Sequence, residues 1–252
     1  MGVTERAMRQ KKALRIALYL MGLAILAAGI TLNTKTTLGV SPIVSVAYCV
    51  SEITGWNFGN TTFLWYTIFV LVEIALHLIR KTPDWKRTVA ADLLQIVVSL
   101  IFTRFMNLFS AAIPVFETAY PDSFAGSFWG RFLFLLLAVA LTGVGAALSL
   151  FMRIVPNPGD GLVQAISDFT GVRTGTAKNC VDIGCVVLTA ALSLLLLRRV
   201  VGVGVGTLIA MLGVGRVVAV FERLCGARLK KLVEETGARG ASIKSADATL
   251  GR

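Results

Sequence analysis

The sequence predicts an all-α polytopic membrane protein built from two inverted-topology repeats. Three observations predict this fold class: an apolar composition, the placement of the basic residues, and a similarity between the two halves of the chain. Hydrophobic residues make up 56% of the 252 residues and charged residues 15%, with a mean hydropathy of +0.76. A soluble domain carries about 25% charged residues. The first partner that we expect for this chain is therefore a lipid bilayer.

Six apolar segments are long enough to cross that bilayer. A spanning helix needs about 20 residues, because each residue adds about 1.5 Å along a path of about 30 Å. The six segments are 13–32, 60–79, 89–108, 132–151, 176–197 and 203–221. We do not expect the first segment to be a cleaved signal peptide, because it is long and no small-residue cleavage site leads into a soluble domain.

The basic residues predict the orientation of these spans. They gather in three places: Arg6, Arg9, Lys11, Lys12 and Arg15; Arg80, Lys81, Lys86 and Arg87; Arg223, Arg228, Lys230 and Lys231. Basic loops stay in the cytoplasm. The central loop, 109–130, contains Glu117 and Asp122 but no Lys or Arg, so it should face outward. We therefore expect both termini to be cytoplasmic, although Arg198 and Arg199 fall on the outer side. The net charge of +11 indicates orientation here, and no nucleic-acid partner is expected.

The two halves of the chain are similar at a fixed spacing of 116 residues. Positions that coincide at this spacing include Arg15 and Arg131, Gly29 and Gly145, Pro42 and Pro158, Ser51 and Ser167, Glu52 and Asp168, Thr54 and Thr170, Gly55 and Gly171, and Gly59 and Gly175. After a small gap, "TRFMNLF" from Thr103 resembles "GRVVAVF" from Gly215. Proline, glycine and hydroxyl residues in one register indicate a duplication rather than chance similarity of leucines.

Each half also contains a short helical segment between its first two spans. These segments read "SPIVSVAYCVSEITG" and "NPGDGLVQAISDFTG". In each, a proline follows a natural N-cap, Ser41 or Asn157, and a glycine, Gly55 or Gly171, suits the left-handed C-terminal position. A helix of about 13 residues is only about 20 Å long and cannot cross the bilayer.

The short segments decide the topology. If both dip into the membrane and return, each half has three spans, and the odd number inverts the second half relative to the first. Secondary transporters often combine inverted repeats with broken or re-entrant helices. The alternative is a pair of amphipathic helices lying at the membrane interface. The predicted units are a cytoplasmic N-terminus (1–14), a first repeat (15–110), an external loop (111–130), a second repeat (131–221) and a partly disordered cytoplasmic tail (222–252).

Three sequence elements resemble a bacterial protein family. The "GVSP…SEITG" element, its "NPGDG…SDFTG" copy and the later "GVGVGTLIAMLGVGR" are similar to the YczE/YyaS/YitT-type membrane proteins, on the YczE-like side. The resemblance runs from Arg15 to Phe221 and leaves out the tail. It implies a multi-pass protein of the bacterial cytoplasmic (inner) membrane, and it implies no substrate and no catalytic residues.

The two short helices supply the candidate solute site. If their N-termini meet near the midplane, free N–H groups and two positive helix-dipole ends converge there, which favours an anion or a carboxylate. The residues of this predicted site are Ser41, Pro42, Asn157, Pro158, Gly159, Asp160 and Gly161. Asp160 has two interpretations, since a carboxylate in the first turn can simply cap the helix or can bind a proton or cation.

Charged and amide residues within the spans are the candidates for coupling or gating. Lys178, Asn179 and Asp182 begin the fifth span, and the spacing of four residues between Lys178 and Asp182 allows an ion pair. The pair can be structural or can take part in gating. It has no charged counterpart in the first repeat, where Thr62 and Tyr66 occupy the matching positions.

The remaining candidates lie on other spans. Asp92, on the third span, is a candidate for coupling or gating. Arg104 and Arg216 lie at matching positions near span ends, where they are anchors at the membrane interface or ligands of an anionic solute. Glu73 and His77 are expected near the cytoplasmic end of their span, where long side chains reach the interface.

The sequence gives no sign of an enzyme or a cofactor. A metal site is not expected, because His77 is the single histidine and the four cysteines lack C-x-x-C spacing. "VGVGVGTL" follows no strand, so it fits helix packing rather than nucleotide binding. We therefore expect a transporter or channel-like permease for a small polar or anionic solute. The alternatives are a non-transporting membrane scaffold or accessory protein and, third, an intramembrane enzyme. The sequence does not specify an oligomeric state.

Overall fold

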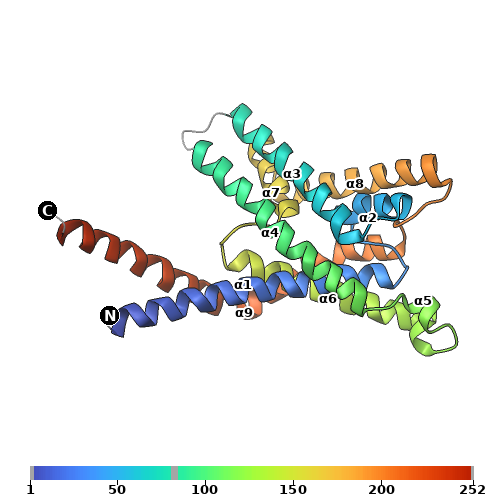
Figure 1. Cartoon of the computed structure of the whole chain (residues 1–252), viewed down its shortest axis with the longest axis horizontal. Coiled ribbons are helices and arrows are strands. Elements are labelled where there is room, and N and C mark those ends of the chain that lie inside the picture. Colours follow the sequence, from blue (N-terminus) through green and yellow to red (C-terminus); the bar gives the residue numbers. More distant parts are fainter. Residues whose placement is uncertain (1–2, 81–84, 251–252) are drawn as a thin grey trace.

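The computed structural model describes residues 3–80 and 85–250, and every regular element in this part of the chain is helical (Figure 1). The elements are α1 (Val3–Lys35), α2 (Pro42–Thr54), α3 (Phe58–Arg80), α4 (Trp85–Ala112), α5 (Phe116–Ala119), η1 (Phe124–Gly126), α6 (Phe128–Phe151), α7 (Pro158–Thr170), α8 (Thr174–Leu197) and α9 (Val205–Leu250).

The six predicted spans are confirmed as helices. Among the described residues, α1, α3, α4, α6, α8 and α9 are long and apolar enough to cross a membrane. Their outer surfaces carry many exposed apolar side chains, such as Leu71, Leu108 and Leu195. Apolar surface on this scale is suited to lipid rather than water. By length and composition, these helices fit a membrane protein with several spans.

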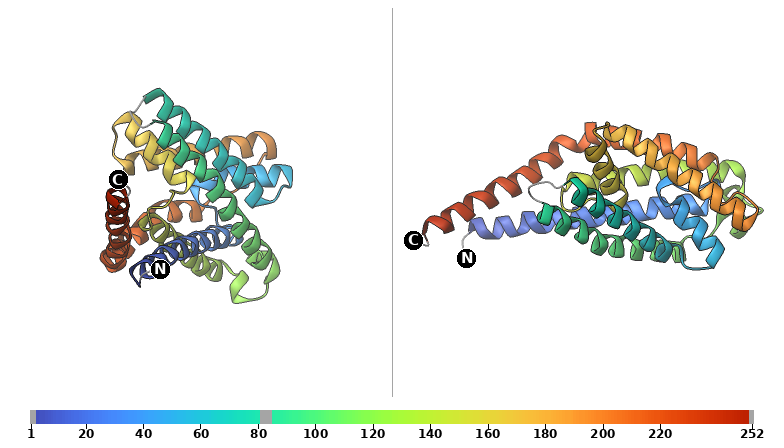
Figure 2. Two further views of the ribbon diagram at one scale, coloured as in Figure 1. Left: turned by 60° about the vertical axis from the view of Figure 1, so that its left-hand side comes forward. Right: turned by 90° about the horizontal axis from the view of Figure 1, so that it is seen from above.

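The chain termini lie at one end of the molecule, and α5 and η1 lie at the other (Figures 1 and 2). The C-terminal end of α3 and the start of α4 point toward the end with the termini (Figure 1). Helix α9 continues into the tail that we expected to be partly disordered, as far as Leu250. Lys81, one of the basic residues used to predict orientation, is outside the described residues.

The two short helices begin and end as predicted. Each contains 13 residues, and each is followed by a glycine in the left-handed conformation, with a φ of 71° at Gly55 and 73° at Gly171. The two helices exchange neighbours between the halves of the chain: α2 packs against α8, and α7 packs against α3. Each short helix also contacts the next span of its own half.

Helices α1 and α6 form the closest contact between the halves, and glycines make it possible. A Cβ added at Gly29 would lie 2.5 Å from the Thr142 nitrogen, and one added at Gly145 would lie 2.3 Å from the Leu26 nitrogen. These two contacts match, because Gly29 and Gly145, and likewise Leu26 and Thr142, are 116 residues apart. Small residues that let helix backbones touch are a common basis of packing in membranes.

Two arginines make a second matched pair of contacts. Arg15 donates to the backbone oxygen of Arg153, at 2.8 Å, and Arg131 donates to the hydroxyl of Thr37. Thr37 and Arg153 are again 116 residues apart, and both have positive φ angles, 57° and 47°. The spacing found in the sequence therefore also describes pairs of tertiary contacts.

Candidate functional site

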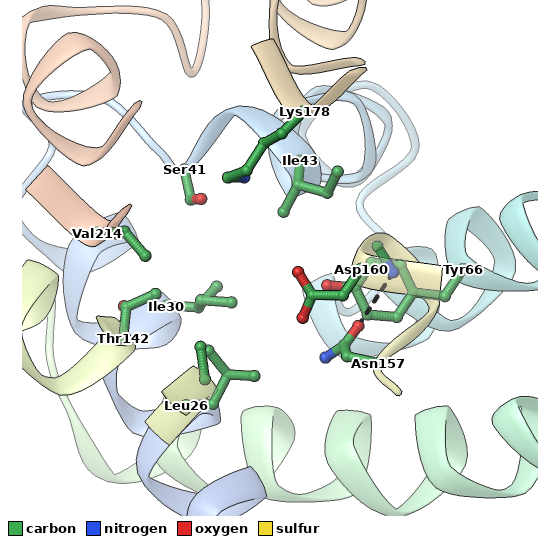
Figure 3. A pocket seen from close by; sticks show the side chains of 12 residues that line it. Leu26, Ile30, Ser41, Ile43, Tyr66, Thr142, Asn157, Asp160, Lys178 and Val214 are labelled. Carbon is green, nitrogen blue, oxygen red and sulfur yellow. Dashed lines mark hydrogen bonds between the residues drawn. The ribbon is translucent and has the colours of Figure 1, made fainter. Parts of the chain in front are cut away.

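A small cavity lies where the starts of α2 and α7 meet α1, α3, α6 and α8 (Figure 3). It encloses about 60 Å³ of space open to water, against about 10–15 Å³ needed for one water molecule. Most of its lining consists of residues 116 positions apart in the sequence: Leu26 and Thr142, Ile30 and Ala146, Ser41 and Asn157, and Ile43 and Gly159. The cavity is thus built from equivalent parts of both halves.

The charged residues of the cavity break this equivalence. Asp160 and Lys178 both line it, and their counterparts in the first half are Val44 and Thr62. Tyr66 also lines it, and its counterpart is Asp182. The matched residues therefore form the walls, while the unmatched ones supply a negative, a positive and a phenolic group.

The start of α7 is capped by Asn157, as predicted. The Asn157 Oδ1 atom accepts a hydrogen bond from the Gly159 backbone N–H at 3.2 Å (Figure 3). The carboxylate of Asp160 instead points into the cavity (Figure 3). The interpretation of Asp160 as the helix cap is therefore not supported, because an amide oxygen already fills that role.

Ser41 occupies the N-cap position of α2 but does not cap it. Its side chain makes no hydrogen bond to the helix start, and its hydroxyl faces the cavity (Figure 3). Pro42 and Pro158, which the sequence placed in the same site, are buried in the first turns of α2 and α7 and do not line the cavity. A free hydroxyl at a helix start is available to a solute.

Lys178 and Asp182 form the predicted ion pair on α8. The Lys178 Nζ and Asp182 Oδ2 atoms lie 3.1 Å apart, and the Asp182 side chain is only 3% exposed. The second carboxylate oxygen of Asp182 is buried and has no hydrogen-bond partner among the described residues. Because Lys178 also lines the cavity (Figure 3), it links that buried carboxylate to the space in front of Asp160.

Four other predicted site residues lie outside the cavity. Asn179, Arg104 and Arg216 are exposed on the helix surfaces, and Arg104 donates to the Asn60 side chain at 2.6 Å. Gly161 faces away from the cavity, toward α3 and α4, because it is one residue and therefore about 100° further around the helix than Asp160.

Asp92 belongs to a second, buried polar cluster between α3 and α4. It lies with Glu73, His77 and Gln95: the His77 Nδ1 and Asp92 Oδ2 atoms are 2.8 Å apart, and Gln95 Nε2 donates to Glu73 Oε1 at 2.8 Å. We name these four residues the α3–α4 cluster. Glu73 is 3% exposed and Asp92 is 3% exposed. The expectation that Glu73 extends to the membrane interface is therefore wrong, and Asp92, a coupling or gating candidate, is buried beside it.

The sequence does contain a signal for the α3–α4 cluster. Helices joined by a short connection run antiparallel, so residues equally far from the connection face each other. Glu73 lies seven residues before the last residue of α3, and Asp92 lies seven residues after the first residue of α4. His77 and Gln95 are each about one turn from these two residues. His77 is the single histidine of the chain, and two buried carboxylates lie beside it.

Comparison with known proteins identifies the family. The family model described as "Family of unknown function (DUF6198)" matches residues 13–223. The uncharacterized membrane protein YczE of Bacillus subtilis (strain 168) is 25% identical over 177 residues, which are 70% of this chain and 74% of that protein. No solved structure matches. The family model covers all six long apolar helices in part or in full and every residue that lines the central cavity, and the chain belongs to the DUF6198 family of membrane proteins.

Proposed function

We propose that this protein is a transporter or channel-like permease for a small polar or anionic solute, which binds in the central cavity. The observation that carries the proposal is the lining of that cavity. Its walls come from matched residues of the two halves, while Asp160 and Lys178 are unmatched. Solute sites of secondary transporters lie at the interface of two repeats and are built from discontinuous helices.

The proposal includes an inverted arrangement of the two halves, each with three spans and a short re-entrant helix. Three features support it. The short helices are too short to span, an odd number of spans reverses the second half, and contacts across α1 and α6 occur in matched pairs. Backbone at membrane depth needs protein or water around it, and the cavity at the starts of α2 and α7 provides both.

The groups around the cavity indicate the chemistry of the solute. The Lys178 ammonium and the Ser41 hydroxyl are hydrogen-bond donors suited to an anionic or polar oxygen. The Asp160 carboxylate points into the cavity (Figure 3) and can accept a hydrogen bond or a proton from the solute. A cavity with about 60 Å³ of space for water suits a solute of a few non-hydrogen atoms.

Flux through reconstituted protein tests the proposal. Proteoliposomes would be loaded with nitrate, formate, acetate, glycine or urea. Efflux of each solute would be compared with its efflux from protein-free liposomes loaded in the same way. We expect at least one of these solutes to cross faster with the protein present. The variant Gly159→Val should abolish that flux, because a Cβ at this position lies 2.9 Å from Ile43 and fills the cavity.

A second glycine, in open surroundings, provides the control. A Cβ at Gly175, at the start of α8, has no neighbour within 4 Å, so Gly175→Val should keep the flux. If flux is absent for every solute, or equal in wild type and Gly159→Val, the permease is contradicted and a non-transporting membrane scaffold becomes the better explanation.

Cysteine labelling tests the orientation. Ala119 in α5 is exposed, so Ala119→Cys can be introduced after replacing the native Cys49, Cys180, Cys185 and Cys225. A membrane-impermeant maleimide should label it from outside intact cells. Labelling only after the cytoplasmic side is opened would contradict both the external central loop and the inverted arrangement.

A further inference from the structure

The α3–α4 cluster has the composition and geometry of a metal site. Glu73, His77 and Asp92 each present one ligand atom, and these atoms lie within 4.8 Å of one another. Bonds of about 2.1 Å from a metal ion place two ligand atoms at most about 4.2 Å apart, so a shift well under 1 Å would bring all three onto one ion.

Two buried oxygens in the cluster lack partners, which is an independent indication of a missing ligand. The Glu73 Oε2 and Gln95 Oε1 atoms are both buried without a hydrogen bond among the described residues, and the two residues are 3% and 1% exposed. Both atoms lie 2.7 Å from the position of a Cβ on Gly161, so they meet the backbone of α7 rather than solvent. A buried acceptor without a partner is costly, and a cation would satisfy both acceptors.

The two carboxylates of the cluster also favour a bound cation. Two carboxylates, Glu73 and Asp92, lie side by side within a membrane protein, where an uncompensated charge is expensive. His77 pairs with Asp92. The first turn of α7 brings Gly161 against the cluster. A divalent cation would neutralise both carboxylates.

We propose that Glu73, His77 and Asp92 bind one divalent transition-metal ion, Zn²⁺ or Mn²⁺, with Gln95 Oε1 as a fourth ligand. A mixed set of one imidazole nitrogen and several oxygens suits these ions, since imidazole favours zinc and its neighbours while carboxylate and amide oxygens favour manganese. The ion joins α3 to α4 directly beneath the first turn of α7. This site is separate from the central cavity, and it does not depend on transport.

Metal content of the purified protein tests the site. Because His77 is the single histidine, the full chain should carry a purification tag without histidine. After EDTA treatment and desalting, the protein in detergent would be incubated with Zn²⁺ or Mn²⁺ and desalted again. Elemental analysis should find about one ion per chain in wild type, and at least tenfold weaker binding in His77→Gln and Asp92→Asn.

The variant Asp182→Asn is the matched control, since it also changes a buried carboxylate but lies in α8. It should bind the ion as wild type does. No bound metal in wild type, or equal metal in wild type, His77→Gln and Asp92→Asn, would overturn the proposal and leave a proton shared between the carboxylates as the better account.

Absorption spectroscopy of the wild-type protein with Co²⁺ tests the metal site even if both variants fail to fold. Co²⁺ bound by nitrogen and oxygen ligands gives visible absorption bands. We expect these bands to saturate at one Co²⁺ per chain and to disappear when Zn²⁺ is added. If wild type develops no such bands above those of Co²⁺ in buffer, the site is rejected.

Discussion

Each short helix packs across a long helix of the other half: α2 crosses α8, and α7 crosses α3. The two crossings use matching positions of the sequence but different kinds of side chain. In the crossing of α2 with α8, Ser45 Oγ lies 2.7 Å from Thr189 Oγ1. The matched positions in the crossing of α7 with α3 are Gly161 and Glu73, and there the glycine backbone meets the carboxylate. The first crossing is closed by two neutral hydroxyls, and the second leaves room for an ionisable side chain.

The same contrast extends to neighbouring matched positions, on α3 and α8 and on α4 and α9. His77 of the α3–α4 cluster corresponds to Ser193, and Gln95 corresponds to Thr207 at the spacing that relates Arg104 to Arg216. Both hydroxyl residues are buried. Small hydroxyl residues hold membrane helices together at modest energies, whereas buried ionisable groups are costly and point to function. At these positions the contact of α2 with α8 is therefore neutral, and the contact of α7 with α3 contains ionisable side chains.

The largest loss of stability should come from a side chain added at Gly161, where α7 contacts the α3–α4 cluster. In Gly161→Val the new side chain would meet Gln95 Oε1 and Glu73 Oε2 at 2.7 Å. We expect about 3 kcal/mol of destabilisation, at the upper end for overpacking, because buried polar groups must also move. Thermal unfolding in detergent measures the loss. Gly175→Val is the control, and an equal loss in both variants would contradict the contact described at Gly161.

The second prediction compares the buried carboxylates of the two halves. Asp182 holds Lys178 at the cavity, while Glu73 lies in the α3–α4 cluster. We therefore expect Asp182→Asn to lower solute flux about tenfold, equivalent to about 1.4 kcal/mol, and Glu73→Gln to lower it less. Flux at equal protein content in proteoliposomes measures both. A larger loss in Glu73→Gln would place the functional charge in the α3–α4 cluster instead.

The third prediction concerns a double variant that gives the contact of α7 with α3 the hydroxyl pair found between α2 and α8. Gly161→Ser alone should be destabilising, because the hydroxyl is placed against Glu73. Adding Glu73→Thr recreates the Ser45–Thr189 pair, and the double variant should recover about 1 kcal/mol relative to the sum of the single variants, as expected for residues in contact. Unfolding of all four proteins under one set of conditions gives this coupling energy. Simple additivity would show that the crossings are not equivalent.

The sequence was sufficient for features that depend on local signals. A proline after a capping residue and a glycine after the last turn are read within one helix, so both short helices were predicted with their observed ends, Pro42–Thr54 and Pro158–Thr170. The ion pair of Lys178 with Asp182 was also predictable, because its partners are one turn apart on a single helix.

Features that depend on packing between distant helices were not predictable in this way. The burial of Glu73 follows from the contact of α7 with α3, which joins the two halves of the chain. The orientation of Gly161 away from the cavity has the same origin, since the neighbour of a helix face is fixed only once the helices are packed. For Ser41, the sequence predicted the N-cap position but not that its hydroxyl would be left free.

The smallest effect should come from the neutral crossing of α2 with α8. Thr189→Val keeps the shape of the side chain but removes a hydroxyl that bonds both Ser45 and the backbone oxygen of Cys185. Ser45 still has the Pro42 oxygen as an acceptor, at 2.7 Å, so no buried donor is left without a partner. Hydrogen bonds between membrane helices contribute about 0.6 kcal/mol on average, and we expect a loss of that order, with solute flux and metal binding unchanged. Unfolding, flux and elemental analysis of this one variant test the comparison directly. A loss as large as that of Gly161→Val would mean that the hydroxyl crossing carries as much of the fold as the charged one.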